Sequence, residues 1–396
     1  MYNIAIIGAG ASGLAAAIAA KRKNAGLSVL LIEALPRVGK KILATGNGRC
    51  NLTNLNASAD KYNSGFVSDI LSEKTPEYIL EFFRSVGLRC VSDSEGRVYP
   101  MSNSAASVLD CLRFETENLG VEILCETRVS SLNVENGQFI INKNIKAEKV
   151  IIAAGGKASP SQGSDGSGFE LLKSLGHRIT PVYPALVQLT VKENVKALKG
   201  VRVKANLTLA QSGRQADRSS GEVLFTDYGL SGIAVMDISR SVKNRNGTCF
   251  IDALPPMSEK EIVDFLFDCK KRNPDLSADN ALGGIIPKKF GQFILKICGI
   301  KNEMPLKMLR PQNISEVSGK IKNLSFEITG TNGFNNAQIT VGGAKLNEFD
   351  SRTLESKIVC GLYAAGEVLD VDSVCGGFNL HWAWASGITA GESAAE

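Results

Sequence analysis

The glycines near the N-terminus constrain the fold of this chain more than any other feature. Gly8-Ala9-Gly10-Ala11-Ser12-Gly13 follows the short apolar run Ile4–Ile7 and opens a stretch rich in Ala and Leu. In a G-x-G-x-x-G turn the first glycine permits the tight turn, the second lets a pyrophosphate approach the backbone, and the third lets the helix pack on the strand. The pattern predicts a β-α-β unit that holds a dinucleotide at the helix N-terminus.

A carboxylate follows the second apolar run of this unit. Ser28–Ile32 is predicted to be the second strand, and Glu33 closes it, 20 residues after Gly13. An acidic side chain at this position accepts hydrogen bonds from ribose hydroxyls and repels a 2′-phosphate. We therefore expect Glu33, with Ala34 beside it, to contact the ribose.

Two later segments repeat the change from apolar strand to glycine. Ile151–Gly156 and Leu362–Glu367 both have this form, and no second G-x-G-x-x-G follows a strand. In FAD enzymes of the glutathione-reductase type, the chain leaves the nucleotide domain at one such segment and returns to the ribityl side of the flavin at another. The pattern favours FAD over NAD and predicts cofactor contacts from Ala154, Gly155, Gly156, Gly366 and Glu367.

A last pair of glycines opens an apolar segment of helical length. Gly376, Gly377, Phe378 and Asn379 precede Leu380–Ala390. A helix N-terminus beside the flavin pyrimidine stabilises the negative charge that the reduced flavin carries at N1 and O2. We expect these four residues at the flavin.

Both chain ends carry nucleotide-domain patterns, which makes the middle of the chain an insertion. Alternation such as Val201, Val203 and Ala205 between polar neighbours indicates β-strands there. The predicted fold class is α/β, with a Rossmann-type FAD domain of the glutathione-reductase kind built from both ends and a β-rich insertion that carries a small helical subdomain. The expected boundaries are 1–185 and 341–396 for the FAD domain, 186–256 and 311–340 for the β-rich domain, and 257–310 for the helices.

Charge and cysteine usage exclude several classes of protein. The net charge is +5 over 396 residues, and no run of five or more Lys/Arg occurs, so neither a nucleic-acid partner nor a membrane is expected. The nine cysteines form no CxxC pair and there are two histidines, so no metal site is expected. The apolar N-terminal stretch lacks the basic start of a signal peptide. We expect a cytoplasmic protein and leave its oligomeric state open.

Two stretches carry a family resemblance. Gly39–Asn54 reads GKKILATGNGRCNLTN and closely resembles the GKK(L/I)xx(S/T)GxGRCNxTN signature of the BaiN/YhiN-type flavoproteins, a group also labelled NAD(P)/FAD-dependent or aminoacetone oxidase family. Gly366–Gly387 is similar to the C-terminal signature of that group, and Gly221–Gly232 and Thr340–Gly343 also match. The resemblance covers nearly the whole chain and implies the same insertion architecture.

The resemblance also implies cofactor contacts. A loop of Gly, Lys, Arg and Asn offers N–H donors and positive charge to phosphate. By resemblance this loop wraps the FAD pyrophosphate and the flavin, and Val129 meets the adenine through its backbone. The loop residues so implied are Gly39, Lys40, Lys41, Thr45, Gly46, Asn47, Gly48, Arg49, Cys50 and Asn51.

Three residues are candidates for the catalytic site. Asp227 and Tyr228 stand in the middle motif, where either could transfer a proton. His381 lies on the predicted last helix, either as a supporting residue or in contact with the substrate. In the family pattern a His commonly follows Phe-Thr, where this chain has Asp227, so a role of that His does not carry over. Cys50 has no partner Cys or neighbouring His that would make it a thiolate, which favours packing.

The leading functional prediction is an FAD-dependent oxidoreductase that passes a hydride between flavin N5 and a small or amphipathic organic substrate. The resemblance leaves two directions open: a reductase of an unsaturated ketone with external NAD(P)H as electron donor, and an amine oxidase that uses O₂. Two further alternatives are an RNA-modifying flavoprotein, which needs a basic surface, and a non-catalytic FAD-binding sensor.

Overall fold

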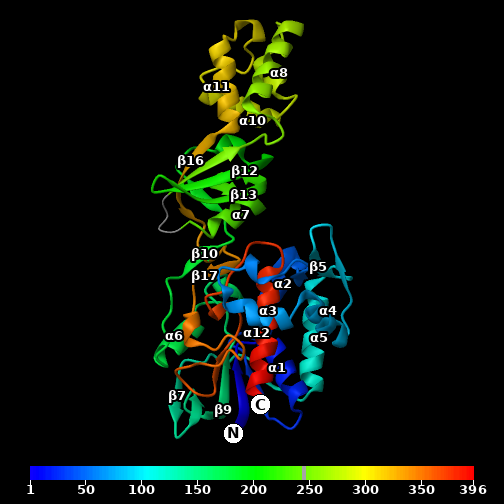
Figure 1. The fold of residues 1–396 in the computed structure, drawn as a ribbon, viewed down its shortest axis with the longest axis vertical. Helices are drawn as coiled ribbons and strands as arrows, with labels where there is room; N and C mark the ends of the chain where they lie inside the picture. The colour runs from blue at the N-terminus through cyan, green and yellow to red at the C-terminus, as the bar shows by residue number, and fades with distance from the viewer. Residues whose placement is uncertain (243–246) are drawn as a thin grey trace. The chain divides into compact units, whose positions relative to one another are not determined.

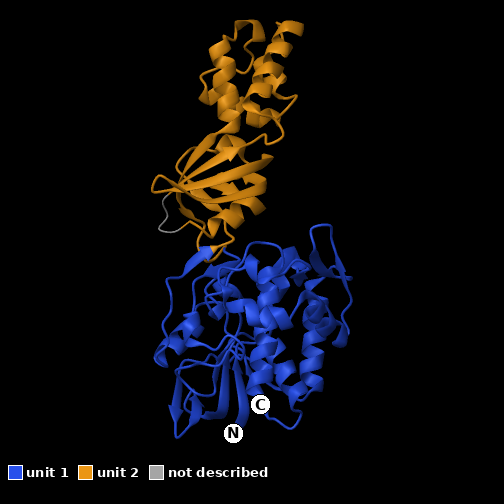
Figure 2. Cartoon of the chain, in the orientation of Figure 1, with its two compact units in different colours: residues 1–184, 337–396 blue, residues 185–336 orange. Residues whose placement is uncertain are grey.

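The computed structural model describes residues 1–242 and 247–396, and its chain divides into two compact units (Figure 2). The first unit holds residues 1–184 and 337–396, and the second holds residues 185–336. Both chain ends therefore belong to one unit, and the other is inserted between them in the sequence. The predicted fold class, a Rossmann-type domain with an insertion, is confirmed.

A mostly parallel sheet forms the core of the first unit. Its strands run in the order β6-β2-β1-β9, with β18 beside β9, and these neighbours pair in parallel. Two antiparallel strands, β8 and β7, extend the sheet from β9. Because parallel strands end at the same edge, the turns after β1, β2, β9 and β18 gather there. The strands are β1 (Tyr2–Ile7), β2 (Val29–Ile32), β6 (Glu122–Leu124), β7 (Leu132–Glu135), β8 (Gln138–Ile141), β9 (Ile145–Ile152) and β18 (Leu362–Ala364).

The first and last helices of the chain pack side by side in this unit (Figure 1). These are α1 (Ala11–Lys23) and α12 (Phe378–Ala394). Small residues allow the close approach: a Cβ on Gly387 would lie 2.3 Å from the Ser12 carbonyl oxygen, and one on Gly391 would lie 2.3 Å from that of Ala16. The contact joins the two halves of the nucleotide domain.

Shorter elements surround this core. A small antiparallel sheet has the order β3-β5-β4, and β10 pairs with β17. In α4, Pro76 occupies the first turn and the Thr75 hydroxyl accepts a hydrogen bond from the Tyr78 N–H, which is a favourable helix start. The elements are α2 (Lys40–Ala44), β3 (Thr53–Asn54), α3 (Ser68–Glu73), α4 (Pro76–Ser85), β4 (Cys90–Ser92), β5 (Arg97–Pro100), α5 (Ala105–Asn118), α6 (Ser167–Ser174), β10 (Tyr183–Ala185) and β17 (Ile339–Val341).

The second unit is a closed barrel with a group of helices. Its strands run in the order β11-β14-β13-β12-β15-β16. Val203, Ala205 and Leu207 on β12 are buried and Lys204 and Asn206 are exposed, as alternation predicts. The strands are β11 (Leu189–Val191), β12 (Arg202–Gln211), β13 (Arg214–Phe225), β14 (Gly229–Ser231), β15 (Gly247–Asp252) and β16 (Leu324–Thr331), and the helices are α7 (Ile233–Ser239), α8 (Glu259–Arg272), α9 (Ala278–Leu282), α10 (Lys288–Ile297) and α11 (Pro311–Lys322).

Two features are absent from the described residues. Over 1–242 and 247–396, no helix has the length and apolar character needed to cross a membrane. Within the same ranges, no group of three or more His, Cys, Asp and Glu side chains is placed to hold a metal ion. All nine cysteines are free thiols.

Candidate cofactor site

The three glycine segments meet at the carboxyl edge of the parallel sheet. Gly8 follows β1 with φ +101, and a Cβ there would lie 2.6 Å from the Ala153 carbonyl oxygen at the end of β9. A Cβ on Gly366, after β18, would lie 2.6 Å from the Ser12 hydroxyl. The segment after β9 also needs glycine, since Gly155 has φ +71. The backbones of these turns approach one another where a Rossmann fold holds its nucleotide.

The N-terminus of α1 is open. Gly10 is its N-cap residue; the structure shows no side-chain cap there among the described residues, and no acidic residue in the first turn. A Cβ on Gly10 would meet no described atom within 4 Å, whereas one on Gly13 would lie 1.8 Å from the Gly8 carbonyl oxygen. Free backbone amides at the positive end of a helix dipole form a cradle for an anion such as a pyrophosphate. The residues present therefore fit the pyrophosphate of a dinucleotide.

Glu33 is held at the end of β2 by backbone amides. It is 8% exposed, and its carboxylate oxygens accept hydrogen bonds from the Ala9 N–H at 3.0 Å and the Leu35 N–H at 2.9 Å. Each oxygen keeps a lone pair for a ribose hydroxyl. The Thr127 N–H donates to the Glu33 carbonyl at 2.9 Å, which brings the segment before buried Val129 alongside the strand end.

The signature loop, residues Gly39–Asn54, begins beside the glycine turn Gly8–Gly13. The Gly39 N–H donates to the Ala9 carbonyl at 2.8 Å, and α2 starts there. Gly46 and Asn47 both have φ +56. Glycine and asparagine adopt this left-handed conformation more readily than other residues, which explains the sequence Thr-Gly-Asn-Gly. Burial raises the pKa of the Cys50 thiol to about 12, so Cys50 is a packed neutral thiol rather than a nucleophile.

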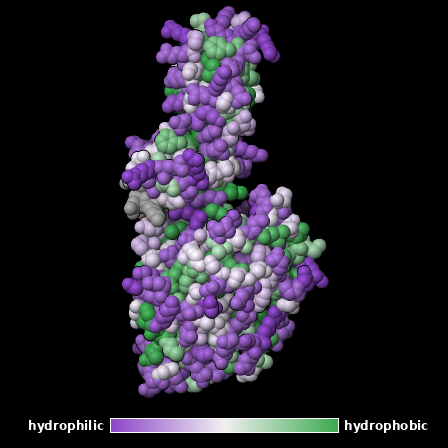
Figure 3. All heavy atoms as spheres, in the orientation of Figure 1, coloured by the Kyte–Doolittle hydropathy of each residue, from purple (hydrophilic) through white to green (hydrophobic). Residues whose placement is uncertain are grey.

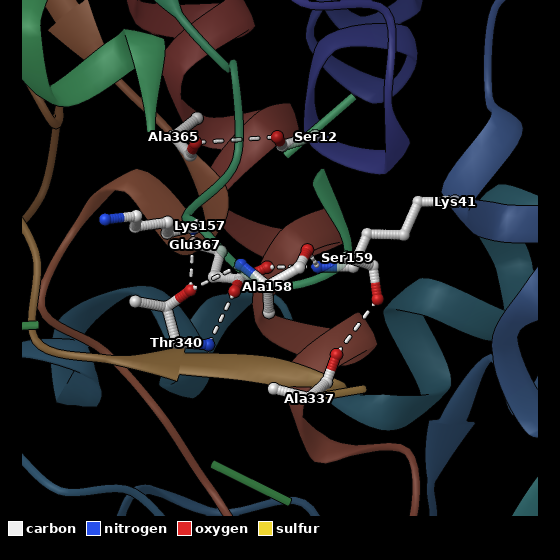
Figure 4. A network of polar contacts seen from close by, with 9 residues as sticks. All are labelled: Ser12, Lys41, Lys157, Ala158, Ser159, Ala337, Thr340, Ala365 and Glu367. Atoms are coloured by element: carbon white, nitrogen blue, oxygen red, sulfur yellow. Dashed lines mark hydrogen bonds and ion pairs between the residues drawn. The ribbon is translucent and has the colours of Figure 1, made fainter. Parts of the chain in front are cut away.

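A network of polar contacts connects this loop to the segments that follow β9 and β18 (Figure 4). Lys41 Nζ lies 2.8 Å from Glu367 Oε2 and donates to the Ala158 carbonyl at 3.1 Å. Glu367 Oε1 accepts from the Thr340 N–H at 2.7 Å, and Thr340 Oγ1 accepts from the N–H groups of Lys157 and Ala158 at 2.7 and 3.0 Å. Lys41 and Glu367, predicted from separate motifs, thus form an ion pair. Because the Glu367 carboxylate balances the charge of Lys41, the pair holds the signature loop against the segment after β18.

The same network occupies the space beside Gly156. A Cβ there would lie 2.4 Å from Thr340 Oγ1 and 2.7 Å from Glu367 Oε1. Lys40 extends the connection because its Nζ donates to the Ser161 carbonyl at 2.9 Å. The side chains of Thr340 and Glu367, packed against the backbone of Gly156, therefore account for the glycine there.

The N-terminus of α12 packs against the end of the signature loop. Gly377 is its N-cap with φ +102, and a Cβ there would lie 2.5 Å from the Thr53 carbonyl oxygen and 2.8 Å from Asn51 Oδ1. Asn54 Nδ2 donates to the Gly376 carbonyl at 3.0 Å. Asn51 Oδ1 is buried and has no hydrogen-bond partner among the described residues. A buried orphan acceptor calls for a donor, and a flavin imide N–H would supply one.

His381 holds Thr53, the residue that packs against Gly377. It is fully buried, with Nε2 at 3.0 Å from the Lys74 carbonyl and Nδ1 at 2.7 Å from Thr53 Oγ1. A carbonyl only accepts, so Nε2 carries the hydrogen and Nδ1 accepts from the Thr53 hydroxyl. Burial lowers the pKa of His381 to about 4. A buried neutral ring with both nitrogens engaged fits the supporting role that the sequence suggested, and a contact of His381 with the substrate stays a prediction.

Asp227 and Tyr228 belong to the second unit, in the turn between β13 and β14. Asp227 Oδ2 lies 2.8 Å from Lys199 Nζ, and the hydrogen bond to Lys199 keeps the pKa of Asp227 below its ordinary value. Tyr228 is 41% exposed. Their proton-transfer roles stay predictions.

Several residues of the site escaped sequence reasoning. Thr340 is the centre of the network in Figure 4, and Thr53 links His381 to Gly377. Both lie inside segments that match the family signatures, so the signal was present in the motifs. Asn379 stabilises the segment before α12, because its side chain forms hydrogen bonds with the backbone of Ser373 and Val374.

A family model described as the HI0933-like protein Rossmann domain matches residues 2–393. The chain belongs to this family. It is 41% identical to the 3-dehydro-bile acid delta(4,6)-reductase of Clostridium scindens, with all of both chains covered. It is 31% identical to the ribosomal RNA dihydrouridine synthase of Escherichia coli, over 97% of this chain and 96% of that one. A quinol–fumarate reductase structure covers all of this chain and 70% of its own, with a TM-score of 0.51 at 16% identity, which shows the fold alone.

The predicted family, the FAD cofactor and the enzyme class are confirmed: this HI0933-like protein is an FAD-dependent oxidoreductase.

Proposed function

We propose that this oxidoreductase saturates a carbon–carbon double bond conjugated to a carbonyl group in a small organic substrate. The observation that carries the proposal is the full-length match to a reductase whose name describes a 4,6-unsaturated, 3-oxo bile acid. The names of the dihydrouridine synthases also describe reduction of a carbon–carbon double bond, that of uridine. Relatives with very different substrates thus share one reaction class, which supports the reductase direction over the oxidase direction.

The residues of the first unit would hold FAD at the sheet edge. The pyrophosphate would lie at the open N-terminus of α1, over Gly8–Gly13, with the ribose at Glu33 and Ala34 and the adenine at the Val129 backbone. The backbone of Gly39–Asn51 and the segments Ala154–Gly156, Gly366–Glu367 and Gly376–Asn379 would hold the flavin. Bound FAD supplies the hydride chemistry, and the positive end of the α12 dipole would stabilise the reduced form.

We further propose that a diffusible NADH or NADPH donates the electrons. The described part of the second unit is a barrel with helices rather than a second β-α-β nucleotide domain. Without a second nucleotide domain among the described residues, the nicotinamide would bind transiently at the flavin and leave after it has donated its hydride.

Anaerobic addition of NADH and NADPH to the FAD-loaded protein tests the direction of the reaction. We expect the absorbance of the oxidised flavin to bleach with one nicotinamide and to return when a conjugated enone is added. A flavin that ignores both nicotinamides but bleaches with an amine would establish the oxidase direction instead.

A second candidate is reduction of uridine in RNA. Two curated relatives at 31% and 30% identity support it, the second from Haemophilus influenzae. Residues 185–336 contain 22 Lys and Arg against 15 Asp and Glu, while the remaining residues contain 23 against 25. The basic excess is thus concentrated in the inserted unit, where it favours a polyanionic partner. Dihydrouridine formed in ribosomal RNA by the purified protein would select this candidate.

A further inference from the structure

One face of the hairpin formed by β4 and β5 carries exposed apolar side chains. Val91 lies opposite Tyr99 in the antiparallel pair, and the Met101 N–H donates to the Arg89 carbonyl at 2.8 Å, which continues the ladder. Residues directly opposite share a face, as do residues two apart on one strand. Val91 is 54% exposed and Met101 69%, whereas Val98 on the other face is buried. Apolar surface is visible over this hairpin in Figure 3.

The guanidinium of Arg49 lies on this face. Its central carbon is 4.6 Å from the centroid of the Tyr99 ring, and its Nε donates to the Gly46 carbonyl at 3.3 Å. In the part of the chain that the structure describes, no carboxylate forms an ion pair with Arg49. Stacking and one backbone bond fix the plane of the group and leave its two terminal nitrogens available. A fixed, unpaired guanidinium matches a carboxylate in a bidentate arrangement.

The hairpin is joined to the candidate cofactor site through β3. Strand β5 pairs with β3, where Thr53 lies opposite Val98, and the Thr53 carbonyl is the atom that would be 2.5 Å from a Cβ on Gly377. Arg49 stands two residues before Asn51, whose buried side-chain oxygen lacks a partner among the described residues. Arg49 therefore connects the exposed face of the hairpin, through Tyr99, to the loop at the proposed flavin position.

We propose that Arg49, held on Tyr99, determines specificity by binding the acid group of an amphipathic substrate whose apolar skeleton lies on Val91, Tyr99 and Met101. The inference rests on the proposed function, since it places the acid end of the molecule whose double bond is reduced. It also gives the Arg49 side chain a substrate contact in place of the cofactor contact that the resemblance implies, while the loop backbone stays with FAD.

The test compares an acid with its neutral ester. A 3-oxo-Δ4 steroid carboxylic acid and its methyl ester are offered to the FAD-loaded wild type and to Arg49→Gln, and KM, kcat and equilibrium binding are measured. We expect KM and Kd for the acid to rise roughly 10- to 100-fold in Arg49→Gln, as for a lost charge-assisted bond, with the ester unchanged. Arg49→Lys should restore part of the preference. Arg84→Gln, which removes an exposed arginine already paired with Glu81, is the matched control.

Four outcomes would count against the inference. Loss of FAD from Arg49→Gln would assign the side chain to the cofactor, and an equal effect on acid and ester would remove its role in specificity. Failure of the wild type to bind either compound would reject this substrate class, as would an RNA band shift that depends on Arg49. Binding without reduction would instead contradict the proposed function and leave the anchor supported, so the two failures are distinguishable.

Discussion

Helices α1 and α12 both begin at a glycine without a side-chain cap among the described residues, but the surroundings of the two glycines differ. Gly10 has φ −82, which any residue adopts, and a Cβ there would meet no described atom within 4 Å. Gly377 has φ +102, and a Cβ there would lie 2.5 Å from the Thr53 carbonyl. The same residue type therefore marks open space at one helix and tight packing of the chain at the other. In this account, Gly10 is required by a ligand and Gly377 by the fold.

Replacing Gly377 should have the largest effect on stability. Gly377→Val combines a left-handed backbone with a steric clash against backbone, and we expect the free energy of unfolding to fall by about 2–4 kcal/mol. Urea unfolding of the apoprotein measures this change. The Gly377→Val variant is also expected to lose FAD. A variant with unchanged stability and unchanged FAD binding would show that the packing at α12 is not as described.

The contact behind Gly377 predicts a pH dependence. Because the folded-state pKa of His381 is lowered from 6.5 to about 4, the unfolded chain takes up a proton below pH 6.5 that the folded chain excludes. Stability should therefore fall as the pH decreases from 6.5 to 4, by up to about 3 kcal/mol in total.

Unfolding titrations across this window measure the slope, and His381→Gln provides the comparison. We expect the variant to lose most of the slope and to keep the part that belongs to His177, whose pKa burial also lowers. An identical slope in both proteins would mean that His381 is not the buried neutral group described.

The ion pair between Lys41 and Glu367 should have the smallest effect. It joins the signature loop to the segment after β18, and its side chains are 24% and 21% exposed. We expect Lys41→Gln to cost about 1 kcal/mol, and a double-mutant cycle with Glu367→Gln to show a coupling energy of roughly 0.5–1.5 kcal/mol. Additive effects of the two substitutions would show that the pair contributes nothing beyond its separate side chains.

Glycine patterns predicted the first unit well because they report backbone geometry directly. Gly8 takes a positive φ and Gly13 packs against a carbonyl, which are the two requirements that the turn imposes. Glu33 was recognisable because its place at the end of the second strand follows from local spacing. Alternation on β12 predicted buried and exposed faces for the same reason.

Contacts between distant segments were beyond sequence reasoning. The ring of His381 lies between Lys74 and Thr53, more than 300 residues away in the sequence, and no local pattern shows these partners. Lys41 would be read as a phosphate ligand, but Glu367 pairs with it. Arg49 lies on Tyr99, which no motif includes. Side-chain partners of this kind depend on tertiary packing, which one sequence does not encode in local spacing.

The FAD affinity of Gly10→Val, measured together with the unfolding transition of its apoprotein, tests the placement of the cofactor at α1. We expect an unfolding free energy within about 0.5 kcal/mol of the wild type, because the added side chain enters open space. We expect FAD binding to be weakened roughly 10- to 100-fold, because that space is where the pyrophosphate approaches the backbone. A variant that binds FAD as tightly as the wild type would contradict the placement of the cofactor at α1.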